Sequence, residues 1–197
     1  MRKIPRDLEN PIDNWLIQLA DYLSPFFRAT GHTPNMITTY SLITGLLSCY
    51  CLWKGHVILF ALLYALSYFF DCFDGHFARK YKMTSQFGDI YDHVKDVVVV
   101  LLILFVVFKK CKKNINAVII TIFVVFTYMS AIHLGCQQKY CTEGEEDKDD
   151  SAFLNKLRPL CGNKDNIKWT RFFGTGTYNL VLILLICYVC QTKGCAF

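Results

Sequence analysis

Long apolar runs separated by short charged segments limit this chain to few folds. A helix that crosses a bilayer needs about 20 predominantly apolar residues. Of the 197 residues, 53% are hydrophobic and 19% are charged, and the mean hydropathy is +0.29. These values are high for a soluble domain of this size and typical of a membrane protein. The apolar runs cover residues 36–53, 57–70, 97–108, 115–134 and 172–190.

The third apolar run is too short to cross a bilayer alone. Val97–Phe108 spans the hydrocarbon only if its helix begins near Gly88, which puts Asp92, Lys95 and Asp96 in the first turns. A further span within 153–161 would be too short and too charged. We therefore expect an all-α, polytopic membrane helix bundle of five to six transmembrane helices.

The segment before the first span predicts an amphipathic helix on the membrane surface. Its apolar and aromatic residues recur at helical spacing, at Trp15, Leu19, Tyr22, Leu23 and Phe26. Packing of this helix against the bundle is compatible with that prediction. The whole chain is expected to be one domain, with an interfacial helix (1–33), catalytic spans (34–135), a polar loop (136–172) and a last span (173–192).

The placement of Lys and Arg predicts the orientation. With the N-terminus inside, fifteen of these residues fall on the inner side and six on the outer side, although the cluster at 109–113 argues the other way. The net charge of +5 suits anionic lipid headgroups and phosphorylated ligands rather than nucleic acid. The ten cysteines show no zinc pattern: Cys136, Cys141 and Cys161 form no CxxC pair, and no His has ligand spacing.

Two sets of residues at helical spacing carry the chemistry. The first has the spacing i, i+3, i+4, i+7 and the second i, i+4: Asp71, Asp74, Gly75 and Ala78; Asp92 and Asp96. Each set lies on one helical face, so two adjacent helices can direct four carboxylates into one cleft. Carboxylates at the ends of membrane spans are costly unless a cation, a partner or water compensates them.

The residue types in these sets indicate a site for a metal and a diphosphate. All-oxygen ligation suits Mg²⁺, Mn²⁺ or Ca²⁺ rather than zinc. Gly75 and Ala78 leave space beside the carboxylates, and Arg79 offers a fork of donors to a phosphate. The alternative is that the aspartates cap helix ends or pair with Lys80, Lys82 and Lys95.

The segment resembles the signature of the CDP-alcohol phosphotransferases, D-x2-D-G-x2-A-R, eight residues, G-x3-D-x3-D. Every fixed position is filled, by Asp71, Asp74, Gly75, Ala78, Arg79, Gly88, Asp92 and Asp96. Pro34, Asn35 and Thr38 resemble the start of the family's first span more weakly.

The resemblance implies a membrane-bound, metal-dependent phospholipid-synthesising transferase, often a homodimer. Asp71, Asp74, Asp92 and Asp96 would surround two divalent ions, Mg²⁺ or Mn²⁺. The donor's cytidine diphosphate would be held by Asn35, Gly75, Ala78 and Arg79. An acceptor hydroxyl would attack the β-phosphorus and release CMP.

Two questions stay open at this point. The base is His93 or Asp96, and the segment Asp92-His93-x2-Asp96 resembles the D-H-x2-D form of the choline and ethanolamine phosphotransferases. That likeness favours CDP-choline or CDP-ethanolamine as donor and diacylglycerol as acceptor. The small size favours CDP-diacylglycerol as donor and inositol, serine or glycerol phosphate as acceptor.

Two further expectations complete this interpretation. The active site would face the cytoplasm, in the endoplasmic reticulum if the source is eukaryotic. A rival class is a non-catalytic membrane protein that binds divalent cations, but that function would leave Gly75, Ala78 and Arg79 without a role.

Overall fold

The structure is a computed structural model that describes residues 3–142, 154–191 and 195, and every regular element in these ranges is helical. The long helices are α1 (Pro11–Ala29), α2 (Pro34–Trp53), α3 (Val57–Lys80), α4 (Gln86–Cys111), α5 (Ala117–Thr142) and α7 (Thr175–Gln191). The short ones are η1 (Lys112–Asn114), η2 (Leu154–Leu160), η3 (Lys164–Asn166), α6 (Ile167–Thr170) and η4 (Arg171–Phe173). The acidic run at 143–150 lies outside the described residues.

The long helices confirm the expected fold class, a polytopic helical bundle. Within the described ranges, four helical stretches are long and apolar enough to cross a membrane: α2, α3, residues 117–140 and residues 167–191. The remaining predicted span, the third along the chain, is α4, which is 26 residues long. Charged residues precede its apolar run and two lysines follow it, so its composition differs from that of the other four. α5 continues to Thr142, into the segment predicted as a polar loop.

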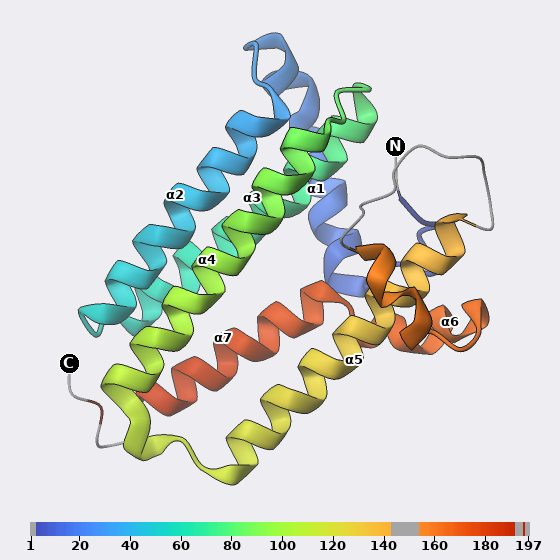
Figure 1. The fold of residues 1–197 in the computed structure, drawn as a ribbon. Helices are drawn as coiled ribbons and strands as arrows, with labels where there is room; N and C mark the ends of the chain where they lie inside the picture. Colours follow the sequence, from blue (N-terminus) through green and yellow to red (C-terminus); the bar gives the residue numbers. More distant parts are fainter. Residues whose placement is uncertain (1–2, 143–153, 192–194, 196–197) are drawn as a thin grey trace.

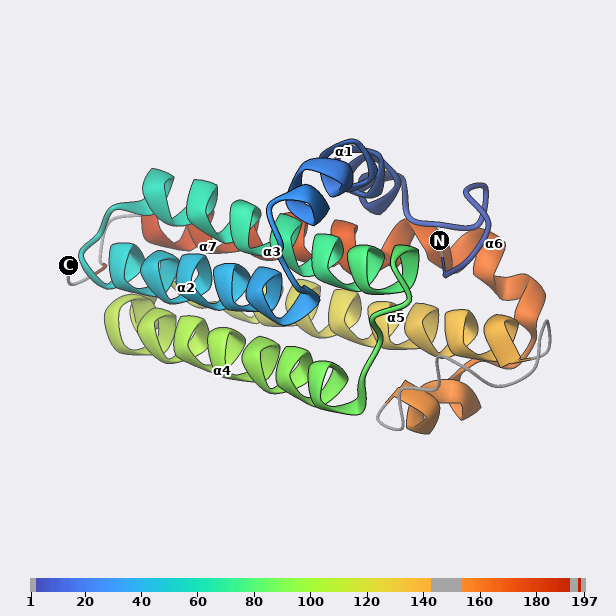
Figure 2. The same cartoon turned by 90° about the horizontal axis from the view of Figure 1, so that it is seen from above.

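α2 lies between α3 and α4 (Figures 1 and 2). Gly45 permits this close packing, because a Cβ there would lie 2.9 Å from Val99 Cγ2 and 3.0 Å from Ser67 Oγ. Ser41 Oγ donates to the Ser67 carbonyl at 2.9 Å, and Ser67 Oγ donates to the Ser41 carbonyl at 2.8 Å. The three helices that carry the signature residues and Asn35 are therefore held closely together.

α1 crosses the outside of α3 (Figure 2). Its inner face packs Leu16 and Ala20 against a cluster that includes Phe73. Its outer face leaves Trp15 66% and Tyr22 83% exposed. An aromatic face of this kind suits a bilayer interface, and its placement on the membrane surface stays a prediction.

A buried carboxylate joins α1 to the start of α7. Asp13 accepts hydrogen bonds from Tyr68 Oη at 2.5 Å, Thr175 Oγ1 at 3.2 Å and the Gly176 amide at 3.3 Å. Burial raises the pKa of the Asp13 carboxyl, although these hydrogen bonds act against the rise. Asp13 thus caps a helix that begins far away in the sequence.

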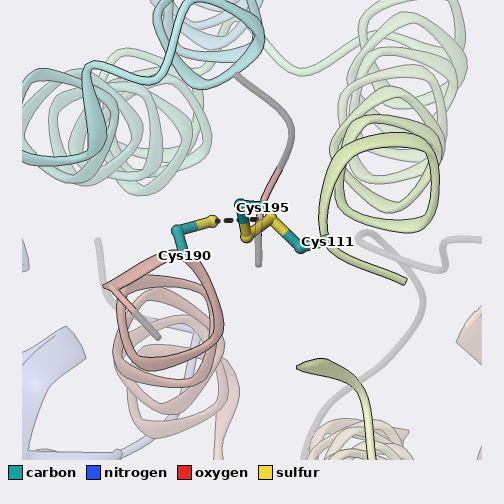
Figure 3. A group of neighbouring side chains, drawn as sticks. All are labelled: Cys111, Cys190 and Cys195. Atoms are coloured by element: carbon teal, nitrogen blue, oxygen red, sulfur yellow. Dashed lines mark hydrogen bonds between the residues drawn. A yellow bond between two sulfur atoms is a disulfide. The ribbon is translucent and has the colours of Figure 1, made fainter. Parts of the chain in front are cut away.

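Two disulfides lie toward opposite ends of α5. Cys136 pairs with Cys161, and Cys111 pairs with Cys195. Cys190 Sγ lies 3.7 Å from Cys111 Sγ (Figure 3). The sequence analysis predicted neither pair, because the partners are 25 and 84 residues apart and no local pattern links them.

Candidate active site

The candidate site forms where α3 ends and α4 begins. α3 runs without interruption to Lys80, so the first signature set lies on one helical face. α4 begins at Gln86, and the Ser85 side chain caps it by accepting a hydrogen bond from the Gly88 amide at 3.0 Å. This short connection brings the second set of aspartates beside the first.

Three of the four predicted aspartates converge closely. One carboxylate oxygen from each of Asp71, Asp92 and Asp96 lies within 4.8 Å of the other two. The side chains of Asp71 and Asp92 are 22% and 29% exposed, and that of Asp96 is 54% exposed. The fourth, Asp74, is 5% exposed, and its Oδ2 atom has no hydrogen-bond partner among the described residues.

These carboxylates fit a divalent cation. A buried carboxylate oxygen without a donor is costly, as Asp74 Oδ2 is here, and a cation relieves that cost. The cluster offers only oxygen ligands, the type that Mg²⁺ and Mn²⁺ prefer. The alternative, that the aspartates pair with nearby lysines, applies to Lys95, whereas Lys80 contacts Asp21 at 2.5 Å instead.

Lys95 lies at the centre of the aspartate cluster. Its Nζ contacts Asp71, Asp92 at 3.1 Å and Asp96 at 2.8 Å. It also donates to Ser41 Oγ at 3.1 Å, and its side chain is 2% exposed. From the sequence, Lys95 was expected only as a partner in structural ion pairs, because helical spacing does not indicate contact with three carboxylates.

A cleft of about 430 Å³ lies on one side of the aspartates. Asp74 and Asp92 line it, together with the four residues predicted to bind the donor: Asn35, Gly75, Ala78 and Arg79. The rest of its lining comes from the N-terminal segment, α2, the α3–α4 connection and α4: Lys3, Pro34, Thr38, Met83, Thr84, Ser85, Gln86, Gly88, Asp89 and His93. We call this space the first cleft.

Two glycines shape the first cleft. A Cβ on Gly75 would lie 3.3 Å from Arg79 Nη1, so this glycine makes room for the guanidinium as well as for a ligand. A Cβ on Gly88 would lie 3.0 Å from Asn35 Oδ1, so this glycine lets the start of α2 approach α4. Both glycines of the signature therefore place a predicted binding side chain.

A second cavity of about 310 Å³ borders the opposite part of the cluster. Asp71, Lys95 and Asp96 line it, and it shares no lining residue with the first cleft. Nine of the remaining lining residues carry a hydroxyl or amide group, although most of the surface of this cavity is apolar: Ser41, Tyr64, Ser67, Tyr68, Thr127, Ser130, Thr175, Tyr178 and Asn179. Val99, Val100, Ala131 and Leu134 complete it. Several of these residues come from α5 and α7, and the sequence analysis predicted none of them.

The two candidate bases face different cavities. His93 lines the first cleft, and its Nδ1 lies 2.7 Å from the Asp89 carbonyl oxygen. A carbonyl only accepts, so Nδ1 carries the proton and Nε2 carries the basic lone pair. Asp96 lines the second cavity. The four aspartates thus form a wall between two cavities, with one candidate base on each side.

His76 and Lys80 lie beyond this wall, where α3 meets α1. His76 Nε2 lies 3.1 Å from Asp21 Oδ1, and Lys80 donates to the same oxygen. Hydrogen bonds from Lys80 and His76 lower the pKa of the Asp21 carboxyl. These groups hold α1 on the bundle and take no part in the cluster.

The fold and the site together define a membrane helix bundle with a metal-type carboxylate cluster at the end of its spans. The family model named CDP-alcohol phosphatidyltransferase matches residues 31–148, more than half of the chain. The chain belongs to this family, as the signature residues predicted.

One curated relative is the CDP-diacylglycerol--inositol 3-phosphatidyltransferase of Candida albicans (strain SC5314 / ATCC MYA-2876). It is 35% identical over 65 residues, which cover 33% of this chain and 28% of the relative. The match therefore spans less than a third of either protein. No solved structure matches the chain.

Proposed function

We propose that this chain transfers a phosphatidyl group from CDP-diacylglycerol to a hydroxyl of a small polar alcohol and releases CMP. The observation that carries the proposal is the wall of four aspartates between two cavities of different character. Both substrates of such a transferase must reach the aspartates, because the acceptor oxygen has to come within about 3–3.5 Å of the phosphorus that it attacks.

The first cleft suits the cytidine diphosphate of the donor. Arg79 gives it a guanidinium, which forms paired hydrogen bonds with phosphate oxygens. Gly75 and Ala78 allow a diphosphate to approach the backbone of α3 closely. Asn35 can hydrogen-bond to the polar groups of a nucleotide.

We assign the second cavity to an uncharged polyol acceptor. Nine hydroxyl or amide side chains line it, and its charged residues all belong to the cluster: Asp71, Lys95 and Asp96. Hydroxyls such as those of Tyr64, Tyr68 and Thr175 already donate within the protein. Their oxygens can still accept a hydrogen bond from a polyol such as inositol, which the hydrocarbon chains of diacylglycerol cannot donate. The partial match to an inositol phosphatidyltransferase agrees with this choice.

Asp96 is the base in this arrangement, because it faces the cavity assigned to the acceptor. The acceptor oxygen forms a bond to the β-phosphorus, and the bond from that phosphorus to the oxygen of CMP breaks. The hydroxyl proton passes to Asp96, and CMP leaves with the electron pair. A divalent cation held by the aspartates, Mg²⁺ or Mn²⁺, would neutralise charge on the diphosphate.

A second candidate keeps the same chemistry with CDP-choline or CDP-ethanolamine as donor and diacylglycerol as acceptor. The position of His93 favours it, because this side chain lines the first cleft. In that arrangement His93 would take the proton from the lipid hydroxyl. The non-catalytic, cation-binding alternative predicts no CMP release from any donor.

We also propose a multi-pass orientation with the site at the cytoplasmic face. The end of α3, the start of α4 and the start of α2 share the side that holds most Lys and Arg residues. A cytoplasmic site would have access to the water-soluble acceptor and would release CMP into the cytosol.

The experiment is a CMP-release assay on purified protein in lipid nanodiscs with Mg²⁺ or Mn²⁺. CDP-diacylglycerol, CDP-choline and CDP-ethanolamine are each combined with inositol, serine, glycerol 3-phosphate or diacylglycerol. We expect CMP only from CDP-diacylglycerol, and most with inositol. Release from CDP-choline with diacylglycerol would support the second candidate instead. No release from folded protein would leave the cation-binding alternative.

A matched pair of variants controls this assay. Asp92→Asn removes one carboxylate of the cluster and should abolish turnover, because a neutral amide is a poor metal ligand. Asp165→Asn makes the same change on an exposed residue that contacts Lys168 at 3.6 Å, and its turnover should equal that of the wild type.

A further inference from the structure

We propose that Lys95 takes the place of one divalent ion, so that the aspartate cluster binds a single metal ion, on the side of Asp74 and the first cleft. The inference concerns the same site as the proposed function. It rests on that function in one respect, namely that the reaction needs a metal ion. It differs from the two ions that the family resemblance implies. Position 95 is not among the fixed positions of the signature, so the family pattern does not predict a cation there.

The ammonium group of Lys95 is fully coordinated by the protein. Lys95 Nζ has four oxygen neighbours, from Asp71, Asp92, Asp96 and Ser41. An ammonium has three N–H donors, so these neighbours are enough to engage all of them. The side chain is almost completely buried, and it is therefore a fixed part of the wall.

The ammonium and a metal ion exclude each other at these carboxylates. The same three carboxylates, Asp71, Asp92 and Asp96, form the closest oxygen cluster among the described acidic residues. Mg²⁺ would need these oxygens at about 2.0–2.1 Å, in the space where Nζ lies. One of the two positions expected for divalent ions is therefore filled by the protein itself.

A metal ion is still necessary on the side of Asp74. Asp74 Oδ2 is buried and has no hydrogen-bond partner among the described residues. Asp74 lines the first cleft with Asp92, whereas Lys95 lines the second cavity. The uncompensated carboxylate charge thus faces the cleft assigned to the diphosphate, and that is the side on which an ion is needed.

Charge balance agrees with this division. Four carboxylates and one ammonium leave three excess negative charges, and like charges this close repel strongly. One divalent ion lowers that excess to one. The guanidinium of Arg79, which also lines the first cleft, offsets the remainder.

The test counts bound Mn²⁺ per chain in purified protein in nanodiscs, from the electron paramagnetic resonance of free Mn²⁺. We expect one ion for the wild type and two for Lys95→Gln, because the amide no longer fills the second position. Lys80→Gln removes the same charge outside the cluster, where Lys80 contacts Asp21, and should still bind one ion. Asp74→Asn should lose the ion.

Thermal unfolding without metal provides a second readout. Lys95→Gln leaves the buried carboxylates unpaired, so its Tm in EDTA should fall by about 10 °C, and Mn²⁺ should restore it. If Lys95→Gln does not fold, the number of Mn²⁺ ions bound by the wild type tests the inference by itself. Two ions in the wild type, or one ion in folded Lys95→Gln, would overturn the inference. Neither result depends on turnover, so failure of the CMP-release assay would refute the proposed function and not this one.

Discussion

Gly75→Ala should separate the stability of this protein from its binding of the donor. Gly75 lies within α3, where its absent side chain leaves room for Arg79. A Cβ there would lie 3.3 Å from Arg79 Nη1, 3.5 Å from Nη2 and 3.8 Å from Cζ. All three atoms belong to the end of one flexible side chain, which can move without disturbing the backbone.

Two opposite effects follow from this geometry. Alanine is more favourable than glycine in a helix interior by about 0.8–1.0 kcal/mol. For a chain of this size, that gain raises Tm by about 2–4 °C. Displacement of the guanidinium weakens a charge-assisted hydrogen bond to phosphate worth about 1.5–3 kcal/mol. At about 1.4 kcal/mol per factor of ten, KM for the CDP-linked donor should rise about 10- to 100-fold.

Gly45→Ala is the matched control. This glycine also lies within a helix, but its new Cβ would lie 2.9 Å from Val99 Cγ2, at a packed contact between helices. Overpacking of this kind costs about 1–3 kcal/mol, which cancels or exceeds the gain in helix propensity. We expect an unchanged or lower Tm and an unchanged KM for the donor.

The two measurements are thermal unfolding in nanodiscs and the dependence of CMP release on donor concentration. If Gly75→Ala binds the donor like the wild type, Arg79 does not hold the phosphates. If Gly75→Ala instead lowers Tm, the glycine is required for packing, and the interpretation of its contact with Arg79 is wrong.

Four further outcomes are expected. Asp96→Asn should lower kcat by about 10²- to 10⁴-fold, whereas His93→Ala should stay within a few-fold of the wild type, and the reverse order would assign the base to the histidine. The disulfides Cys111–Cys195 and Cys136–Cys161 should lie on opposite sides of the membrane. In sealed vesicles, a membrane-impermeant reductant followed by an impermeant thiol reagent should therefore label the cysteines of only one pair. Labelling of both pairs would contradict the bundle's orientation across the membrane. Asp13 has a raised pKa when folded, so its contribution to stability is greatest below pH 3.8 and declines as pH rises toward the folded pKa. Over this pH range, the Tm of Asp13→Asn should therefore fall less than the Tm of the wild type, as measured by thermal unfolding at a series of pH values.

Helix positions and the faces of the signature helices were predictable because both depend on local periodicity. Apolar runs marked the helices that became α2, α3, α5 and α7. Asp71 and Asp74 share a face because they are three residues apart in one helix, whatever else the chain does. The predicted donor residues Gly75, Ala78 and Arg79 line one cleft for the same reason. Asn35 joins them only because α2 packs between α3 and α4.

The second cavity was not predictable, because it depends on contacts between distant segments. Its lining combines Tyr64 from α3 with Thr127 from α5 and Asn179 from α7. Tyr64 Oη donates to Asn179 Oδ1 at 2.7 Å across 115 residues of sequence. No periodic pattern in one helix indicates which face of another helix it will meet.

The sequence by itself determined a membrane bundle of helices and a set of carboxylates near the end of two spans, because apolar length and helical spacing act within a single segment. Tertiary structure alone decided that Lys95 enters the carboxylate cluster, that Asp13 caps α7 and that Cys111 meets Cys195. The physical reason is that a buried charge or a thiol acquires its role from its partners, and packing brings those partners together from distant parts of the chain.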